Sequence, residues 1–153
     1  MAMWKSIVCG VDGMATCREA VRVAARLARE ESARLVLLHV EKPRSGEGLL
    51  APPPARIAFA RQQETERWSG LATAVRGEPV PLELADGDPA DGIVAFAVKT
   101  GCDLIVLGSR GRSRASLALA SVTGKVLAHA PCAVIVVPAG LEDVRADFPD
   151  QVA

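Results

Sequence analysis

A glycine turn followed by hydroxyl residues is the strongest chemical feature of this sequence. Gly108-Ser-Arg-Gly111 comes directly after a short apolar run, and Ser121 and Thr123 follow further along the chain. Glycines let the backbone approach an anion, and helix N-terminal amides and hydroxyl groups donate hydrogen bonds to phosphate oxygens. Residues Leu104 to Val122 are therefore predicted to form a strand, a turn and a helix start that hold nucleotide phosphates. A plain tight connection is the open alternative.

Charged and imidazole side chains near the ends of apolar runs are further candidates. Asp12 is either a ligand for ribose or metal-bound water, or part of an Asp-Gly turn. Arg110, Arg112 and Arg114 form either a phosphate clamp or a solvated loop, and Arg110, nearest to the strand end, is favoured for contact. His39 is predicted to be a core histidine in preference to a ligand.

Sequence motifs of several enzyme classes are missing. The Walker A and G-x-G-x-x-G spacings do not occur, because Gly124-Lys125 is followed by Val126 and lacks the upstream glycine. Ser109 does not lie in a G-x-S-x-G elbow. A P-loop NTPase, a dinucleotide enzyme and a serine hydrolase are therefore disfavoured, and the pattern indicates binding more than catalysis.

The cysteine pattern indicates neither a disulfide framework nor a zinc site. The chain has four cysteines, without a C-x-x-C pair, and two histidines. We expect small buried thiols in an intracellular protein. The cysteines are Cys9, Cys17, Cys102 and Cys132.

Length and charge set further bounds. The 153 residues suffice for one buried core, and the 18 basic residues equal the 18 acidic residues in number, which gives no support for a nucleic-acid partner. The apolar runs are shorter than the roughly 20 residues that span a bilayer, and the N-terminus lacks the pattern of a signal peptide. We expect a cytoplasmic protein with no membrane partner.

Short apolar runs alternate along the chain with segments of helical periodicity. Five runs are predicted to be strands: Ser6 to Val11, Arg34 to Val40, Val80 to Leu84, Asp103 to Leu107, and Ala133 to Val137. Four segments are predicted to be helices. The first starts with a Thr16–Glu19 capping box and buries Ala20, Val23, Ala24 and Leu27. The other three are Ala55 to Val75, Asp88 to Gly101, and about Ser116 to His129. Residues 41–54 read as a long surface connection.

Strands that alternate with helices predict a doubly wound α/β fold with a five-stranded parallel sheet and helices on both faces. Pro81 lacks an amide donor, so the third strand, with Val80, Leu82 and Leu84 on one buried face, should be an edge strand. The expected order is then 3-2-1-4-5, with a ligand crevice at the carboxyl ends of strands one and four. We expect one domain over residues 1–140 and a loose tail over 141–153.

The order of several short segments resembles the universal stress protein family across nearly the whole chain. Each segment is weak alone, but their combination is specific. The segments are Ile7-Val-Cys-Gly-Val-Asp-Gly13, Leu37-Leu-His-Val40, Gly87-Asp-Pro-Ala90, Cys102-Asp-Leu-Ile-Val-Leu-Gly-Ser-Arg-Gly111, Ala120-Ser-Val-Thr123 and Ala130-Pro-Cys-Ala-Val-Ile-Val-Val-Pro138.

This resemblance implies a nucleotide-binding stress-response or signalling protein that holds ATP or AMP, with or without Mg. It also implies a homodimer formed through the last strand, Ala133 to Val137. By this resemblance, one set of residues would line the adenine and ribose end of the site: Val11, Asp12 and Val40. A second set would hold the ribose and phosphates: Gly108, Arg110, Gly111, Ser121 and Val122.

The sequence departs from the family's ATP-binding signature, which reads glycine, two residues, glycine, nine residues, glycine and then serine or threonine. Eight residues separate Gly111 from Ala120, and Ala120 stands where that signature has glycine. A methyl group there could crowd a phosphate. The alternative is a dimeric interaction module of the same family that binds no nucleotide, and any catalysis would be at most slow ATP hydrolysis.

Overall fold

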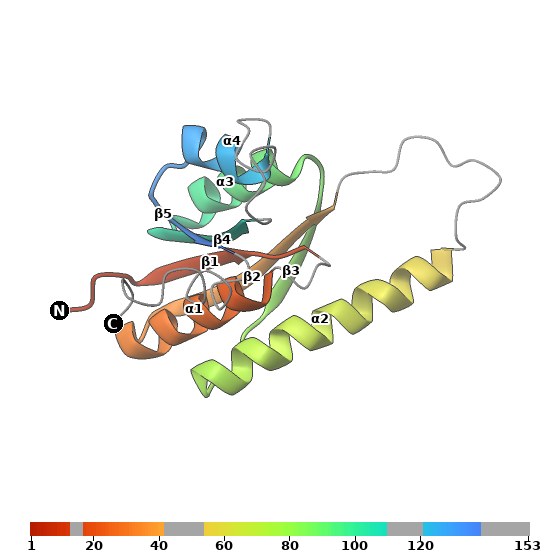
Figure 1. Ribbon diagram of the computed structural model, residues 1–153, viewed down its shortest axis with the longest axis horizontal. Helices are drawn as coiled ribbons and strands as arrows, with labels where there is room; N and C mark the ends of the chain where they lie inside the picture. The colour runs from red at the N-terminus through yellow and green to blue at the C-terminus, as the bar shows by residue number, and fades with distance from the viewer. Residues whose placement is uncertain (13–16, 42–53, 110–120, 139–153) are drawn as a thin grey trace, which may run out of the picture.

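The computed structural model describes residues 1–12, 17–41, 54–109 and 121–138 (Figure 1). Its centre is a five-stranded parallel sheet with the strand order β3-β2-β1-β4-β5, which confirms the predicted fold class and order. The strands are β1 (Ser6–Gly10), β2 (Arg34–Glu41), β3 (Leu82–Asp86), β4 (Leu104–Ser109) and β5 (Ala133–Pro138).

The described helices cover both faces of this sheet. Figure 1 shows α1 and α2 on one face, and α3 and α4 on the other. The helices are α1 (Cys17–Glu31), α2 (Pro54–Arg76), α3 (Pro89–Thr100) and α4 (Val122–His129). Because β1 lies at the centre, its side chains are buried on both faces, and Ile7, Val8 and Cys9 are at most 1% exposed. This double burial explains why β1 is an unbroken apolar run.

The buried face of α1 is wider than its periodicity predicts. Ala20 and Ala24 are buried as expected, whereas Val23 and Leu27 are only partly buried. Val21, Ala25 and Ala28 are buried as well. The helix packs against both the sheet and α2, so two adjoining stripes lose their contact with water.

The third strand lies at the sheet edge, as Pro81 predicts, but it begins two residues later than expected. The carbonyl of Pro81 accepts a hydrogen bond from the Leu37 N–H (2.9 Å), a role that requires no amide donor from proline. The predicted buried face is only partly correct, because Val80 is 2% exposed and Leu84 is 54% exposed. As an edge strand, β3 has limited contact with α2, so the side chain of Leu84 stays exposed.

The helix expected from about Ser116 begins at Val122. Ser121 has an extended backbone (φ −70°, ψ 155°) and caps the helix. Residues 116–120 lie outside the described residues, as do Thr16 of the expected capping box, the connection over 42–53 and the tail over 141–153.

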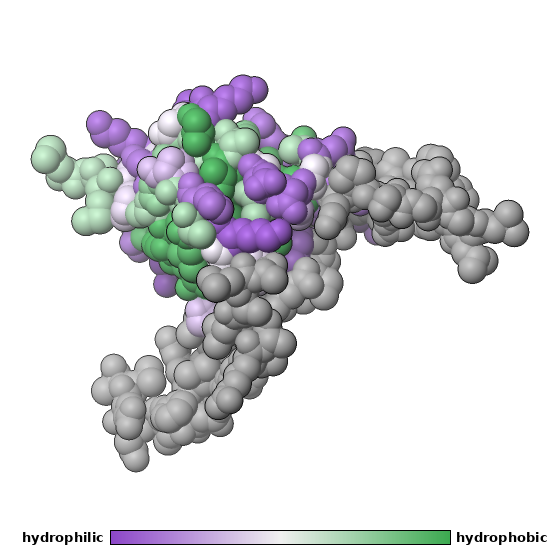
Figure 2. Space-filling model, turned by 90° about the horizontal axis from the view of Figure 1, so that it is seen from above, coloured by the Kyte–Doolittle hydropathy of each residue, from purple (hydrophilic) through white to green (hydrophobic). Residues whose placement is uncertain are grey.

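The surface formed by α3 and α4 carries both hydrophilic and apolar side chains (Figure 2). Val98 is 65% exposed and Leu127 is 55% exposed. Within the described part of the chain, no helix is both long and apolar enough to cross a membrane.

Candidate functional site

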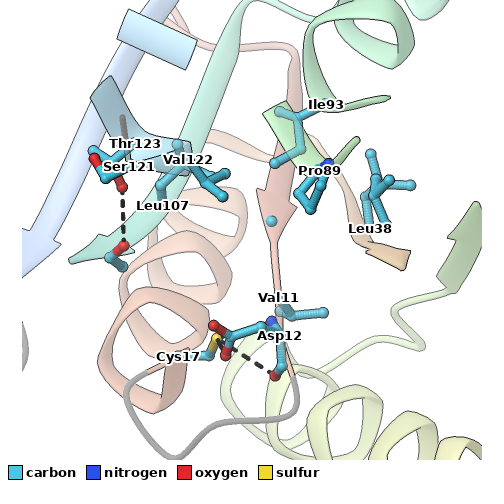
Figure 3. Close-up of a pocket in the computed structure, with 13 residues that line it drawn as sticks. Val11, Asp12, Cys17, Leu38, Pro89, Ile93, Leu107, Ser121, Val122 and Thr123 are labelled. Atoms are coloured by element: carbon cyan, nitrogen blue, oxygen red, sulfur yellow. Dashed lines mark hydrogen bonds between the residues drawn. The ribbon is translucent and has the colours of Figure 1, made fainter. Parts of the chain in front are cut away.

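A cavity of about 390 Å³ opens at the carboxyl ends of β1, β2 and β4, beside the first turns of α3 and α4 (Figure 3). This is the crevice that the strand order predicts, and its volume lies within the range of about 300–1,000 Å³ for small-molecule sites. The cavity is lined by Gly10, Val11, Asp12, Cys17, Leu38, Val40, Pro89, Ile93, Leu107, Gly108, Ser121, Val122 and Thr123.

Two glycines set the width of this cavity. A Cβ atom at Gly10 would lie 2.6 Å from Leu107 Cδ2 and 3.1 Å from Ile93 Cδ1, so only glycine leaves those side chains where they are. A Cβ atom at Gly92 would lie 2.7 Å from Val40 Cγ1. Helix α3 therefore approaches β2 closely, and this contact positions Val40 against the cavity.

Asp12 and Cys17 form a small polar cluster at one end of the cavity. The Cys17 thiol donates to Asp12 Oδ1 (2.8 Å), and the Asp12 N–H donates to Cys17 Sγ (3.1 Å). Cys17 opens α1 and is 5% exposed. Since an ionised carboxylate has about four acceptor positions, Asp12 can hold the thiol and also accept a hydrogen bond from a ligand hydroxyl.

The first turn of α4 borders the cavity at its other side. Ser121 Oγ accepts a hydrogen bond from the Gly124 N–H (3.0 Å), and Thr123 Oγ1 donates to the Gly108 carbonyl (3.3 Å; Figure 3). The amides of Val122 and Thr123 belong to a helix start, where N–H groups have no partner within the helix. Within the described residues the structure shows no acceptor for the Ser121 hydroxyl proton, whereas the Thr123 hydroxyl donates its own and fixes α4 on β4.

The first turn of α3 differs because a carboxylate already occupies it. Asp88 caps the helix and accepts hydrogen bonds from the Ala90 and Asp91 N–H groups (3.1 and 3.2 Å), and Pro89 has no N–H. Lys125 Nζ on α4 lies 3.8 Å from Asp88 Oδ2. An anion in the cavity therefore meets a helix end at α3 that a carboxylate partly neutralises, and a helix end at α4 that, among the described residues, only an uncharged hydroxyl caps.

The structure brings most of the predicted site residues together. Six of the eight line the cavity: Val11, Asp12, Val40, Gly108, Ser121 and Val122. Arg110 and Gly111 lie outside the described residues. His39 alternates with Leu38 and Val40, so it points to the opposite face of the sheet and is half-buried there.

Sequence reasoning did not assign a site role to several cavity residues. For Cys17, the only signal in the sequence is its position, one residue after the expected N-cap residue Thr16. Pro89 and Ile93 are four residues apart and therefore share one face of α3. This spacing could have predicted that both face the cavity. The unassigned residues are Gly10, Cys17, Leu38, Pro89 and Ile93.

The chemistry of this lining favours binding. Its walls are mainly aliphatic, and polar groups lie at two ends: Asp12 with Cys17, and the first turn of α4. In the described ranges, no group of three or more His, Cys, Asp or Glu residues has the arrangement of a metal site. Such a cavity suits a flat ring with a hydroxyl-bearing part near Asp12 and an anionic part near Ser121.

Comparison with known proteins assigns the chain to a family. The model of the universal stress protein family matches residues 3–138. The chain belongs to the universal stress protein family. A universal stress protein of Thermus aquaticus is 36% identical over 140 residues, which cover 88% of this chain and 99% of the relative.

Solved structures of universal stress proteins have the same fold. One, determined in complex with cAMP, matches with a TM-score of 0.74 and 22% identity over 90% of this chain and 98% of its own. Another, from Archaeoglobus fulgidus in complex with dAMP, has a TM-score of 0.67 and 21% identity over 90% of this chain and 99% of its own. These likenesses establish the α/β architecture.

Proposed function

We propose that this universal stress protein binds an adenine nucleotide, ATP or AMP, in the cavity at the carboxyl ends of β1, β2 and β4. The observation that carries the proposal is the arrangement of the cavity: an aliphatic slot with a carboxylate at one end and a helix N-terminus at the other. The cAMP and dAMP complexes of two relatives with this fold support it, because both ligands are adenine nucleotides.

The adenine ring would lie among the aliphatic side chains contributed by β1, β2 and α3. Val11 and Val40 would contact its faces, and Asp12 would accept a hydrogen bond from the ribose. Burying the ring between aliphatic groups contributes hydrophobic free energy, and the carboxylate fixes its orientation.

The phosphates would lie at the first turn of α4. The amide of Val122 and the hydroxyl of Ser121 would donate to phosphate oxygens, and the backbone at Gly108 would allow close approach. Arg110 and Gly111 complete this assignment, and a Mg ion would accompany a polyphosphate. The nucleotide itself supplies the anionic charge that the N-terminus of α4 attracts.

The same proposal includes a homodimer formed through β5. This strand pairs with β4 on one side and is the last in the sheet order, so no described strand pairs with its other edge, and such an edge invites a partner strand. Val134, Ile135 and Val136 are only half-buried within one chain. Joining of two such edges would cover them, and light scattering at micromolar concentration should then report twice the chain mass.

A role in the stress response, a cytoplasmic location and a single domain over residues 1–140 also belong to the proposal. Their support is family membership and the span of the family match, residues 3–138. Occupancy of the cavity would alter the dimer or its partner surface.

Isothermal titration calorimetry with ATP and AMP tests the binding step. We expect saturable binding to the purified chain, and a loss of about 10- to 100-fold in affinity for Asp12→Ala, since a hydrogen bond to a charged group contributes about 1.5–3 kcal/mol. Asp91→Ala is the matched control, because Asp91 is exposed on α3 and does not line the cavity. Absence of heat and of any thermal shift at millimolar nucleotide would refute the proposal and favour the ligand-free interaction module.

A further inference from the structure

Two cysteines that are far apart in the sequence meet at the amino ends of β4 and β5, at the opposite end of the sheet from the cavity. The register pairs Leu104 with Ala133, so Asp103 lies abreast of Cys132 and Cys102 lies one residue earlier. Both thiols pack in the cluster beneath α3 and α4. The two thiols are near enough for each to shift the pKa of the other.

The backbone on the Cys102 side is held firmly. Gly101 ends α3 in the left-handed region (φ 64°), and the Cys102 N–H donates to the Ala97 carbonyl (3.2 Å). The two carboxylate oxygens of Asp103 each accept a hydrogen bond at 3.0 Å, Oδ2 from the Lys5 N–H and Oδ1 from the Ser6 N–H. These contacts hold the backbone beside Cys102, and the register of β4 and β5 brings Cys132 next to it.

We propose that Cys102 and Cys132 are a redox-active dithiol that closes to an intramolecular disulfide on reaction with a small-molecule disulfide. The thiolate of Cys132 attacks one sulfur of the reagent, forms a mixed disulfide and releases one small thiolate. Cys102 then attacks the Cys132 sulfur, forms the protein disulfide and releases the second small thiolate. The protein loses two electrons and two protons, and the reagent leaves as two thiols.

The surroundings assign different roles to the two sulfurs. Cys132 is half-buried, whereas Cys102 is 6% exposed, so a reagent reaches Cys132 first. Burial raises the pKa of Cys132 and the Cys102 thiol lowers it in part, so greater exposure together with this interaction favours Cys132 as the attacking group. Cys102 is then already in place as the thiol that displaces the leaving group.

Burial slows the reaction of this dithiol at neutral pH, because it raises the pKa of both thiols. Burial, with smaller contributions from Cys132 and the Asp103 carboxylate, raises the pKa of Cys102 to about 12. Burial also raises the pKa of Cys132, against the opposing effect of the Cys102 thiol. Since only the thiolate reacts, closure should be slow at neutral pH and faster in mildly alkaline solution.

The disulfide would close a loop that contains β4 and α4. Leu107, Gly108 and Ser121 of the cavity wall lie within this loop. Closing it restricts the unfolded chain, so the oxidised protein should melt about 10 °C higher than the reduced protein. Nucleotide binding is not required for this inference.

The test uses the full chain, reduced, desalted and then incubated with glutathione disulfide at pH 8.5. After alkylation of the remaining thiols, intact mass and peptide mapping report the product. We expect two thiols to disappear without bound glutathione, and a peptide that joins Cys102 to Cys132 and is split again by dithiothreitol. In Cys102→Ser, glutathione should instead remain attached to Cys132.

Three results would overturn the inference. They are a cross-link between other cysteines, stable glutathione adducts on the unmutated chain, and no thiol loss in the folded protein while the urea-unfolded chain reacts. The mapping of the unmutated chain decides the matter even if a cysteine variant fails to fold. Equal melting temperatures for the mapped disulfide form and the reduced form would contradict the predicted stabilisation of the loop.

Discussion

Gly92→Ala is expected to destabilise the protein, although alanine is ordinarily the better residue inside a helix. The new Cβ atom would lie 2.7 and 2.9 Å from the two Cγ atoms of Val40 and 3.3 Å from its Cβ. Val40 is 8% exposed, lies in β2 and has a β-branched side chain with restricted rotamers, so it cannot turn aside. Helix α3 would have to move away from the sheet.

The magnitude follows from two opposing effects. Overpacking a core contact costs about 1–3 kcal/mol, and replacing a helical glycine with alanine contributes about 1 kcal/mol. Gly70 on α2 is the matched control, because a Cβ there meets nothing within 4 Å. We expect Gly70→Ala to stabilise the protein by about 1 kcal/mol and Gly92→Ala to destabilise it by about 1 kcal/mol, a difference of about 2 kcal/mol.

Urea unfolding followed by circular dichroism measures both variants. In a Val40→Ala background the two Cγ atoms are gone and only the Cβ atom at 3.3 Å remains, so Gly92→Ala should become stabilising, by less than Gly70→Ala. If Gly92→Ala stabilises the unmutated protein to the same extent as Gly70→Ala, the close approach of α3 to β2 is not rigid. The reasoning about the width of the cavity would then be wrong.

Three further measurements test separate parts of the structure. Ser121→Ala removes the acceptor for the Gly124 N–H and should lower the free energy of unfolding by about 1 kcal/mol in urea, and an unchanged midpoint would contradict the cap. The Cys102 thiol keeps its proton up to a pKa of about 12, against about 9 when unfolded, so stability should fall as pH rises between these values. In Cys102→Ala, the free energy of unfolding should fall less steeply with pH, by up to about 1.4 kcal/mol per pH unit. Equal pH profiles of stability for the variant and the unmutated protein would contradict the burial argument. Asp12→Ala removes the carboxylate that accepts from the Cys17 thiol and should speed alkylation of that thiol by maleimide, an effect absent in Asp91→Ala.

Local sequence determined the architecture of this protein. Buried parallel strands need unbroken apolar runs, and amphipathic helices need a period of about 3.6 residues, so each element could be recognised without its neighbours. Pro81 alone placed the third strand at the edge, because proline lacks the donor that a central strand requires. With the order known, the carboxyl ends of β1 and β4 had to border the cavity.

Only the tertiary structure decided which side chains meet across elements. The bond between Asp12 and Cys17, the approach of Gly92 to Val40 and the exposure of Leu84 depend on packing distances between elements. The adjacency of Cys102 and Cys132 depends on the register of β4 and β5. Periodicity specifies which face a residue occupies within its own element, whereas these contacts depend on how two elements are placed against each other, which no local pattern encodes.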